Sequence, residues 1–293
     1  MSEPRVAVIV PVFNAERTLP RLINSLRRQT YPADRVHVIM VDNNSTDASA
    51  ALIQRHPRIQ LLSQTQYQTP GATRNAGVKA ADADVLAFID ADCWAHPDWL
   101  ARGVSTLTSK GLDRVAGHVE FVLSPRPNIY EVYDSQVNFR QTDFLEADWC
   151  GTGNLFARPR AFEIAGLFDP ALVSAEDFEF GRRATRAGLT LGFEPSAVIY
   201  HCARRSLLSL VRKWMRTEYG AAQVFRRHGL LELHLWNRKA NYRPLWGVWR
   251  KFAPAYQRSP RMRLAVDGIA NILRCAGNMG SFMGYFNLDR RPS

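Results

Sequence analysis

The stretch that decides the fold is Asp84-Val-Leu-Ala-Phe-Ile-Asp-Ala-Asp-Cys-Trp94. Residues 85–89 form a short, almost entirely apolar run, as expected of a strand buried on both faces of a mostly parallel sheet. The run stops at two acids, Asp90 and Asp92, where open α/β sheets bind their ligands. Two carboxylates this close repel one another unless cations offset their charge. Mg²⁺ or Mn²⁺ holding a phosphate is the simplest compensation; a plain turn after a strand is the alternative. A second Asp-x-Asp, at 82–84, precedes the strand and is expected to be a solvated turn.

The chain around this stretch alternates between strands and helices. Apolar runs at 6–10, 36–41 and 59–62 predict further buried strands, and apolar residues at helical spacing predict helices at 19–30 and 71–81. Ser45 or Thr46 is expected to cap a helix that reaches about Arg55. Later strands are expected at 115–123 and 197–200, with helical segments within 127–147 and at 207–227 and 261–286. This order is typical of a parallel α/β sheet.

Asp42 is a third acid that directly follows a predicted buried strand. Its carboxylate could accept a hydrogen bond from a nucleobase N–H or a ribose hydroxyl, or it could cap the next helix. Neither a Gly-x-Gly-x-x-Gly fingerprint nor a P-loop follows a strand. A nucleotide would therefore be held by a carboxylate-bound metal and by side chains, not by a glycine-rich loop.

Charge is distributed unevenly along the 293 residues. Residues 1–200 hold 20 Lys and Arg against 23 Asp and Glu, whereas residues 201–293 hold 18 against 4, a net charge of +14. Such a basic segment suggests contact with an anionic surface. Because residues 237–286 mix aromatic and apolar residues with arginines, a membrane interface is the partner we expect for residues 201–293. A second subunit, or the catalytic domain itself, is the alternative.

Cysteine usage and the N-terminal residues bear on the compartment. The four cysteines are far apart in sequence and form no Cys-x-x-Cys pair, so we expect reduced thiols. Residues 1–5 resemble no signal peptide, and no apolar run is long enough to span a bilayer. We therefore expect a cytoplasmic protein that is peripheral at the inner membrane face.

Seven motifs, in this order along the chain, carry a family resemblance. They are Val8-Ile-Val-Pro-Val-Phe-Asn14, Val41-Asp-Asn-Asn-Ser-Thr-Asp47, Gly71-Ala-Thr-Arg-Asn-Ala-Gly77, Phe88-Ile-Asp-Ala-Asp92, Gly151-Thr-Gly-Asn154, Gly166-Leu-Phe-Asp169 and Glu176-Asp-Phe-Glu-Phe-Gly-Arg-Arg183. Together they resemble family 2 glycosyltransferases, which have the GT-A fold, over about residues 5–220. Each motif alone is weak, but their shared order is specific.

The resemblance implies roles on the side of the sugar donor. Asp42 would bind the nucleobase, Arg74 would help to hold the nucleotide, and Asp90 would touch the ribose or the metal. Asp92 would ligate an Mn²⁺ or Mg²⁺ ion that bridges the two phosphates. Three further members of these motifs, Pro11, Phe13 and Ala91, would also lie against the donor.

The resemblance makes Asp177 the general base, with Glu176 beside the acceptor. Without the resemblance, both acids are explained by a capping box from Ser174 and by the positive end of the helix they begin. Trp149, Gly153 and Asn154 are expected to line the sugar or acceptor pocket, although Trp149 could equally be an ordinary packed tryptophan.

The end of the last predicted strand supplies the remaining candidates. His201 resembles a further metal ligand of some GT-A enzymes, with a plain surface histidine as the alternative. Arg204 and Arg205 could screen the diphosphate. Processive members of the family carry a Gln-x-x-Arg-Trp motif near this position. The segment Arg212-Lys-Trp214 lacks its glutamine, which argues against a polymer-threading synthase.

The sequence thus predicts an α/β protein with a mixed, mostly parallel GT-A sheet flanked by helices, in residues 1–228, and a basic, aromatic-rich helical extension in residues 229–293. The expected activity is inverting, metal-assisted transfer from a UDP- or GDP-linked sugar to a hydroxyl of a glycan, glycolipid or protein. The alternatives are a non-catalytic nucleotide-sugar-binding protein on the same fold and a nucleotidyltransferase. A homodimer is left open, and no nucleic-acid partner is expected because no nucleic-acid-binding motif is present.

Overall fold

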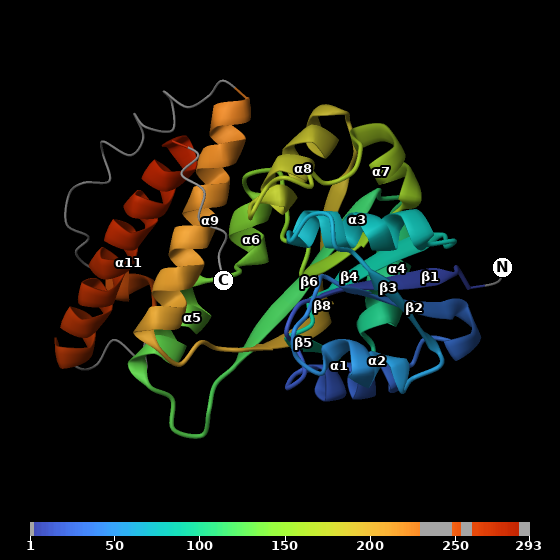
Figure 1. Ribbon diagram of the computed structural model, residues 1–293, viewed down its shortest axis with the longest axis horizontal. Helices are drawn as coiled ribbons and strands as arrows, with labels where there is room; N and C mark the ends of the chain where they lie inside the picture. Colours follow the sequence, from blue (N-terminus) through green and yellow to red (C-terminus); the bar gives the residue numbers. More distant parts are fainter. Residues whose placement is uncertain (1–2, 229–247, 253–259, 287–293) are drawn as a thin grey trace. The chain divides into compact units, whose positions relative to one another are not determined.

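The computed structural model describes residues 3–228, 248–252 and 260–286 (Figure 1). The chain divides into two compact units. The first comprises Met1–Phe121, Phe139–Ala171 and Glu176–Cys202, and the second comprises Val122–Asn138, Leu172–Ala175 and Ala203–Ser293. Because residues 229–247 lie outside the described part, the domain boundary predicted at residue 228 stays a prediction.

An eight-stranded sheet forms the centre of the first unit, in the order β3-β2-β1-β4-β7-β6-β8-β5. The strands are β1 Val6–Val12, β2 Val36–Asp42, β3 Ile59–Ser63, β4 Val85–Ile89, β5 Cys93–Ala95, β6 Arg114–Val122, β7 Asn154–Ala157 and β8 Leu191–Cys202. Strands β1 to β4 pair in parallel, whereas β7 pairs antiparallel with both β4 and β6. This confirms the predicted mixed sheet, with its parallel part in β1 to β4.

Helices cover both faces of this sheet (Figure 1). Alternate residues of β1 point to opposite faces, so Val8 and Val10 enter one apolar core while Ala7 and Ile9 enter the other. The helices of this unit are α1 Leu19–Arg27, η1 Ala33–Arg35, α2 Ser49–Gln54, α3 Pro70–Ala80, α4 Trp99–Ser109, α6 Gln141–Leu145, α7 Pro159–Ala165 and α8 Glu176–Arg186. Helices α1, α2 and α4 supply the first core, and α7 and α8 supply the second.

Two local predictions in this unit were wrong. Helix α2 begins at Ser49 and has Ala48, not Ser45 or Thr46, as its N-cap. The reason is that Ser45 and Thr46 bond to Asn14 instead, through its backbone N–H and its side-chain oxygen. Strand β8 begins six residues earlier than the predicted 197–200 strand and ends at Cys202, because it pairs with β6 as well as with β5.

The second unit is helical over the residues described. It contains α5 Ile129–Val137, α9 Leu207–Arg227, η3 Val248–Lys251 and α11 Pro260–Phe286, which confirms the helices predicted at 207–227 and 261–286. Apolar residues of α5, α9 and α11 share one core. Glycines let α9 and α11 approach closely: a Cβ at Gly280 would lie 2.2 Å from the Met215 oxygen, and one at Gly284 would lie 2.4 Å from the Tyr219 oxygen. No described helix is both long and apolar enough to cross a membrane.

Candidate functional site

Two of the predicted site acids lie at the same edge of the sheet. Asp42 is the last residue of β2 and pairs with Val12 at the end of β1. Asp90 directly follows β4, which pairs with β1 on its other side. Since β2 and β4 flank one strand, the two acids are separated by two strand spacings, roughly 10 Å. The parallel register therefore brings them to one edge of the sheet, as the sequence predicted.

The Asp42 carboxylate is buried and only half satisfied. One oxygen accepts a hydrogen bond from the Ser45 N–H at 3.2 Å. The other oxygen, Oδ1, has no hydrogen-bond partner among the residues that the structure describes. A buried acceptor without a partner is costly, so this oxygen is suited to a donor from a ligand. Phe13, just beyond the end of β1, is 51% exposed, and Pro11 lies within β1.

Arg74 of α3 connects the two acidic motifs. Its guanidinium donates to Asp90 Oδ1 at 2.7 Å and to Glu176 Oε1 at 2.5 Å, and its side chain is 6% exposed. Burial lowers the pKa of Arg74, but the two carboxylates outweigh burial, so the pKa is raised above its ordinary value. Arg74 is therefore a permanent cation that fixes the start of α8 against the carboxyl end of β4.

Two further contacts hold the chain that leads into α8 against α3. The Asn75 side chain donates to the Phe168 carbonyl at 2.8 Å and accepts from the Phe168 N–H at 3.0 Å. Thr69, the N-cap of α3, donates to the Pro170 carbonyl at 2.7 Å. The motif at 71–77 is thus bonded directly to the motif at 166–169 through Asn75 and Phe168.

Asp177 follows Glu176 in the first turn of α8. Its carboxylate accepts the Phe178 N–H at 2.8 Å. Burial, together with repulsion from Glu176, raises the pKa of Asp177 to about 7, even though Arg74 and the Phe178 N–H act in the opposite direction. A carboxylate with a pKa near 7 is suited to accept a proton at neutral pH.

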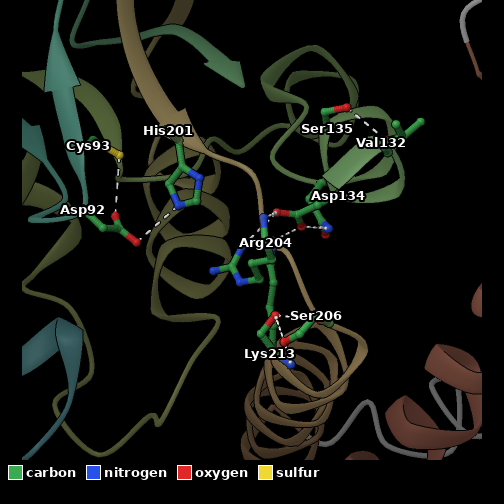
Figure 2. Close-up of polar contacts among 11 residues, drawn as sticks. Asp92, Cys93, Val132, Asp134, Ser135, His201, Arg204, Ser206 and Lys213 are labelled. Carbon is green, nitrogen blue, oxygen red and sulfur yellow. Dashed lines mark hydrogen bonds and ion pairs between the residues drawn. The ribbon is translucent and has the colours of Figure 1, made fainter. Parts of the chain in front are cut away.

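The side chains of Cys93 and His201 lie on either side of Asp92, which is half-exposed (Figure 2). Its Oδ2 lies 3.2 Å from His201 Nε2, and its Oδ1 accepts from the Cys93 thiol at 3.6 Å. The antiparallel register of β5 and β8 places Cys93 directly opposite His201, and the Phe121 ring packs edge-on against the imidazole at 5.3 Å. The buried Ala91 separates Asp92 from Asp90.

These side chains fit a divalent cation. Ligand atoms of Asp92, Cys93 and His201 all lie within 4.8 Å of one another. A carboxylate oxygen and an imidazole nitrogen are both ligands for first-row divalent ions, and the exposed carboxylate leaves further positions open to ligands. His201, for which a plain surface position was the alternative, therefore lies within reach of a shared ion with Asp92.

Three residues predicted to line a pocket have distinct surroundings. The Trp149 indole stacks on Phe144, with ring centroids 4.1 Å apart. Gly153 touches the acidic edge, since a Cβ there would lie 2.9 Å from Asp90 Oδ2. Asn154 is completely buried, and its amide bonds to Trp99 and to two backbone carbonyls. Asn154 thus supports the site from inside the core, whereas Gly153 lies at the site itself.

The two arginines predicted near the phosphates belong to the second unit. The Arg204 backbone N–H donates to Asp134 Oδ2 at 2.8 Å, and its guanidinium lies 3.4 Å from the same oxygen (Figure 2). Arg205 pairs with Glu131 at 3.5 Å. Both acids are buried in α5. The arginines therefore attach the start of α9 to α5, and contact with a phosphate stays a prediction.

Cys93 is the residue of this site that sequence reasoning missed. It is 3% exposed, and its thiol is directed at the Asp92 carboxylate. Its position immediately after Asp92 was visible in the sequence, but a single cysteine has no spacing pattern to mark it. Its pairing with His201, 108 positions later, arises only from the register of β5 and β8.

Known proteins resemble this chain in sequence. The model for glycosyl transferase family 2 matches residues 7–161. Glycosyltransferase AglE of Haloferax volcanii is 34% identical over 227 residues, which cover 76% of this chain and 74% of AglE.

Solved structures resemble it in fold. The mannosyltransferase PcManGT of Pyrobaculum calidifontis, in complex with GDP-Man and Mn²⁺, matches 99% of this chain and 89% of its own with a TM-score of 0.66 at 18% identity. Residues 1–349 of S. aureus TarS, in complex with UDP-GlcNAc, match 98% of this chain and 93% of their own with a TM-score of 0.55 at 17% identity. These likenesses confirm the GT-A fold. The family match over more than half of the chain, together with the relationship to AglE, shows that the protein belongs to glycosyl transferase family 2 and is a glycosyltransferase.

Proposed function

We propose that this glycosyltransferase moves a sugar from a UDP- or GDP-linked donor to a hydroxyl acceptor with inversion at the anomeric carbon. The acceptor would be a glycan, a glycolipid or a protein. The observation that carries the proposal is the pair of ion bonds from Arg74 to Asp90 and Glu176, at 2.7 and 2.5 Å. They join Asp90, at the end of β4, to the acid that precedes Asp177, which supports one shared site for the donor and acceptor halves of the reaction.

The nucleobase would bind at Asp42. The buried Oδ1 of this residue, unpaired among the described residues, would accept an N–H from the base, and the exposed Phe13 follows β1, the strand that pairs with β2. Uracil and guanine both present such an N–H. PcManGT is described in complex with GDP-Man and TarS in complex with UDP-GlcNAc, so donors carrying either base are the first to test.

Asp92 and His201 would hold an Mn²⁺ or Mg²⁺ ion, for which their carboxylate and imidazole atoms are suitable. When bound, the ion stabilises the negative charge that develops on the departing diphosphate. The Cys93 thiol, bonded to Asp92 Oδ1, would keep that carboxylate turned toward His201. Among structural neighbours, PcManGT contains Mn²⁺.

Asp177 would act as the general base. Its carboxylate takes the proton of the acceptor hydroxyl while the acceptor oxygen bonds to the anomeric carbon. The bond between that carbon and the phosphate oxygen breaks, and the nucleoside diphosphate leaves with the electron pair. Attack from the face opposite to the leaving group produces inversion in one step. The pKa of about 7 supports this role, since the group both accepts and releases protons at neutral pH.

A panel of nucleotide sugars tests the proposal. We expect release of UDP or GDP that requires Mn²⁺ or Mg²⁺ and stops with EDTA. NMR of the product should show the anomer opposite to that of the donor. Asp177→Asn should stop turnover and leave donor binding, measured by calorimetry, within about twofold. Retained anomeric configuration, or full turnover by Asp177→Asn, would contradict the mechanism.

A further inference from the structure

Helix α11 exposes an apolar face along most of its length. Its exposed large side chains are Leu264, Ile272, Met279, Phe282 and Phe286, which are 46–66% exposed. These positions follow helical spacing, with Gly268 and Cys275 completing the same exposed row. The row covers 22 residue steps, roughly 33 Å of helix. The exposed face of a helix in water is normally polar, so this row is built to be covered.

The charges of the second unit point to what covers it. Each carboxylate in its described residues is buried or half-buried: Glu131, Asp134, Glu218 and Asp267. Asp267 accepts the Val248 N–H at 2.9 Å, and a Ser281 hydroxyl lies 3.4 Å from Glu218. The exposed charges on α9 and α11 are all arginines, namely Arg212, Arg216, Arg226, Arg227 and Arg261. The helix pair therefore presents positive charge and apolar surface together, with no carboxylate at its exposed described positions.

One contact shows that the two kinds of side chain are adjacent. The Arg226 guanidinium reaches from the last turn of α9 to the Tyr285 carbonyl on α11, at 3.4 Å. There the Phe282 and Phe286 rings are 4.7 Å apart, and Tyr285 packs edge-on against Phe286 at 4.5 Å. Aromatic rings beside a cation are typical of segments that sit at the headgroup level of a bilayer.

We propose that the outer face of α11, together with the exposed arginines of α9, docks in the interface of an anionic lipid bilayer. The helix would lie in the plane of the surface, with its opposite face packed against α9. A second copy of the chain fits this face less well, because the described residues of both helix pairs would bring arginines and no exposed carboxylate to the contact. This inference goes beyond the proposed transfer reaction and does not depend on it.

Vesicle flotation of the full-length protein tests the proposal. We expect binding to vesicles of phosphatidylcholine mixed with phosphatidylglycerol, weak binding to phosphatidylcholine alone, and release at high salt. Phe282→Glu should weaken binding roughly tenfold or more. Replacing Arg212 and Arg216 by glutamine should weaken it roughly fivefold for each charge. The matched control is Ile164→Glu, because Ile164 is 55% exposed on α7 of the first unit and should leave binding unchanged.

A fluorescent label gives a second readout that needs no destabilising variant. Cys275 lies in the exposed row, and Cys202 is the other exposed cysteine, whereas Cys93 and Cys150 are buried. An environment-sensitive dye on Cys275, in a Cys202→Ser background, should shift to the blue with anionic vesicles. The same dye on Cys202, in a Cys275→Ser background, should not shift.

Three outcomes would overturn the proposal. The first is no salt-sensitive vesicle binding by the native chain. The second is binding that Phe282→Glu leaves intact while the Cys275 dye shows no shift. The third is a native dimer, seen by analytical ultracentrifugation without lipid, that Phe282→Glu converts to monomer; α11 would then be a subunit interface.

Discussion

The guanidinium of Arg74 donates to Glu176 Oε1 at 2.5 Å across 102 positions of sequence. The same group bonds to Asp90 at 2.7 Å. One buried cation thus pairs with two acids from opposite halves of the first unit and determines where Asp177, the next residue after Glu176, can lie. In our account, this ion pair is what unites the donor side and the acceptor side of the site.

Replacing Arg74 by methionine should destabilise the fold and abolish transfer. Glu176, which is 5% exposed, would be left buried without its cation, and removing one partner of a buried pair costs about 3–5 kcal/mol. Urea unfolding measures this loss. Arg5→Met is the matched control, since it breaks the exposed pair with Asp82 and should change stability little. If Arg74→Met were as stable as Arg5→Met, the ion pairs of Arg74 with Asp90 and Glu176 would not stabilise the fold.

The pH dependence of transfer should follow Asp177. Because its pKa is raised to about 7, the carboxyl is protonated below that pH and cannot accept the acceptor proton. We expect kcat/KM to fall roughly tenfold per pH unit on the acid side of about pH 7. Asp84→Asn, an exposed acid before β4, should keep this profile. An acid limb centred near the ordinary value of 3.8 would contradict the assignment.

The same shift predicts how stability depends on pH. Between 3.8 and about 7 the folded state holds a proton on Asp177 that the unfolded state has released. The free energy of unfolding therefore falls as pH rises through this window. Asp177→Asn removes the effect, so the variant should gain stability relative to the native protein as pH rises to about 7 and keep that gain above it. Thermal unfolding across this range measures the difference, and a constant difference would contradict a raised pKa.

Metal binding should require Asp92 and His201. Asp92→Asn and His201→Ala should each weaken Mn²⁺ binding at least about tenfold, as followed by electron paramagnetic resonance of the free ion. The tripeptide 82–84 repeats the Asp-Ala-Asp of 90–92 at the opposite end of β4, so Asp82→Asn is the matched control. The prediction of a solvated turn there is confirmed: Asp82 is 88% exposed and pairs with Arg5. If Asp82→Asn weakened Mn²⁺ binding as much as Asp92→Asn does, the ion would not be bound specifically by Asp92 and His201.

Nucleotide affinity should depend on Asp42. With Oδ1 buried and unpaired among the described residues, a base N–H would contribute about 1.5–3 kcal/mol as a hydrogen bond to a charged group. Asp42→Ala should therefore weaken binding of the nucleoside diphosphate by roughly tenfold or more. Binding of inorganic pyrophosphate should be unaffected, and an equal loss for pyrophosphate would mean that Asp42 does not contact the base.

The sequence could predict the site residues that directly follow buried strands. Buried apolar runs identify β1, β2 and β4, and parallel pairing then necessarily brings Asp42 and Asp90 to one edge. The link from Arg74 to Glu176 could not be derived from spacing, because it depends on how α8 packs against α3. The position of His201 opposite Cys93 likewise depends on a long-range antiparallel register that has no local signal.

The capping of α2 shows the same limit on a smaller scale. Ser45 and Thr46 have the right chemistry for an N-cap, yet both bond to Asn14, which follows β1. Asp47 then accepts the Ser49 N–H and hydroxyl, and the helix starts there. The bonds to Asn14, 31 residues before Ser45, therefore determine where α2 begins, which the local sequence alone leaves open.

The most direct test is a crystal structure with an intact nucleotide sugar, Mn²⁺ and the Asp177→Asn variant. Our account predicts the base against Asp42, the ion between the diphosphate and the side chains of Asp92 and His201, and residue 177 facing the anomeric carbon from the side opposite to the phosphate. A sugar whose reactive carbon is turned away from residue 177, with another carboxylate on that face, would contradict it.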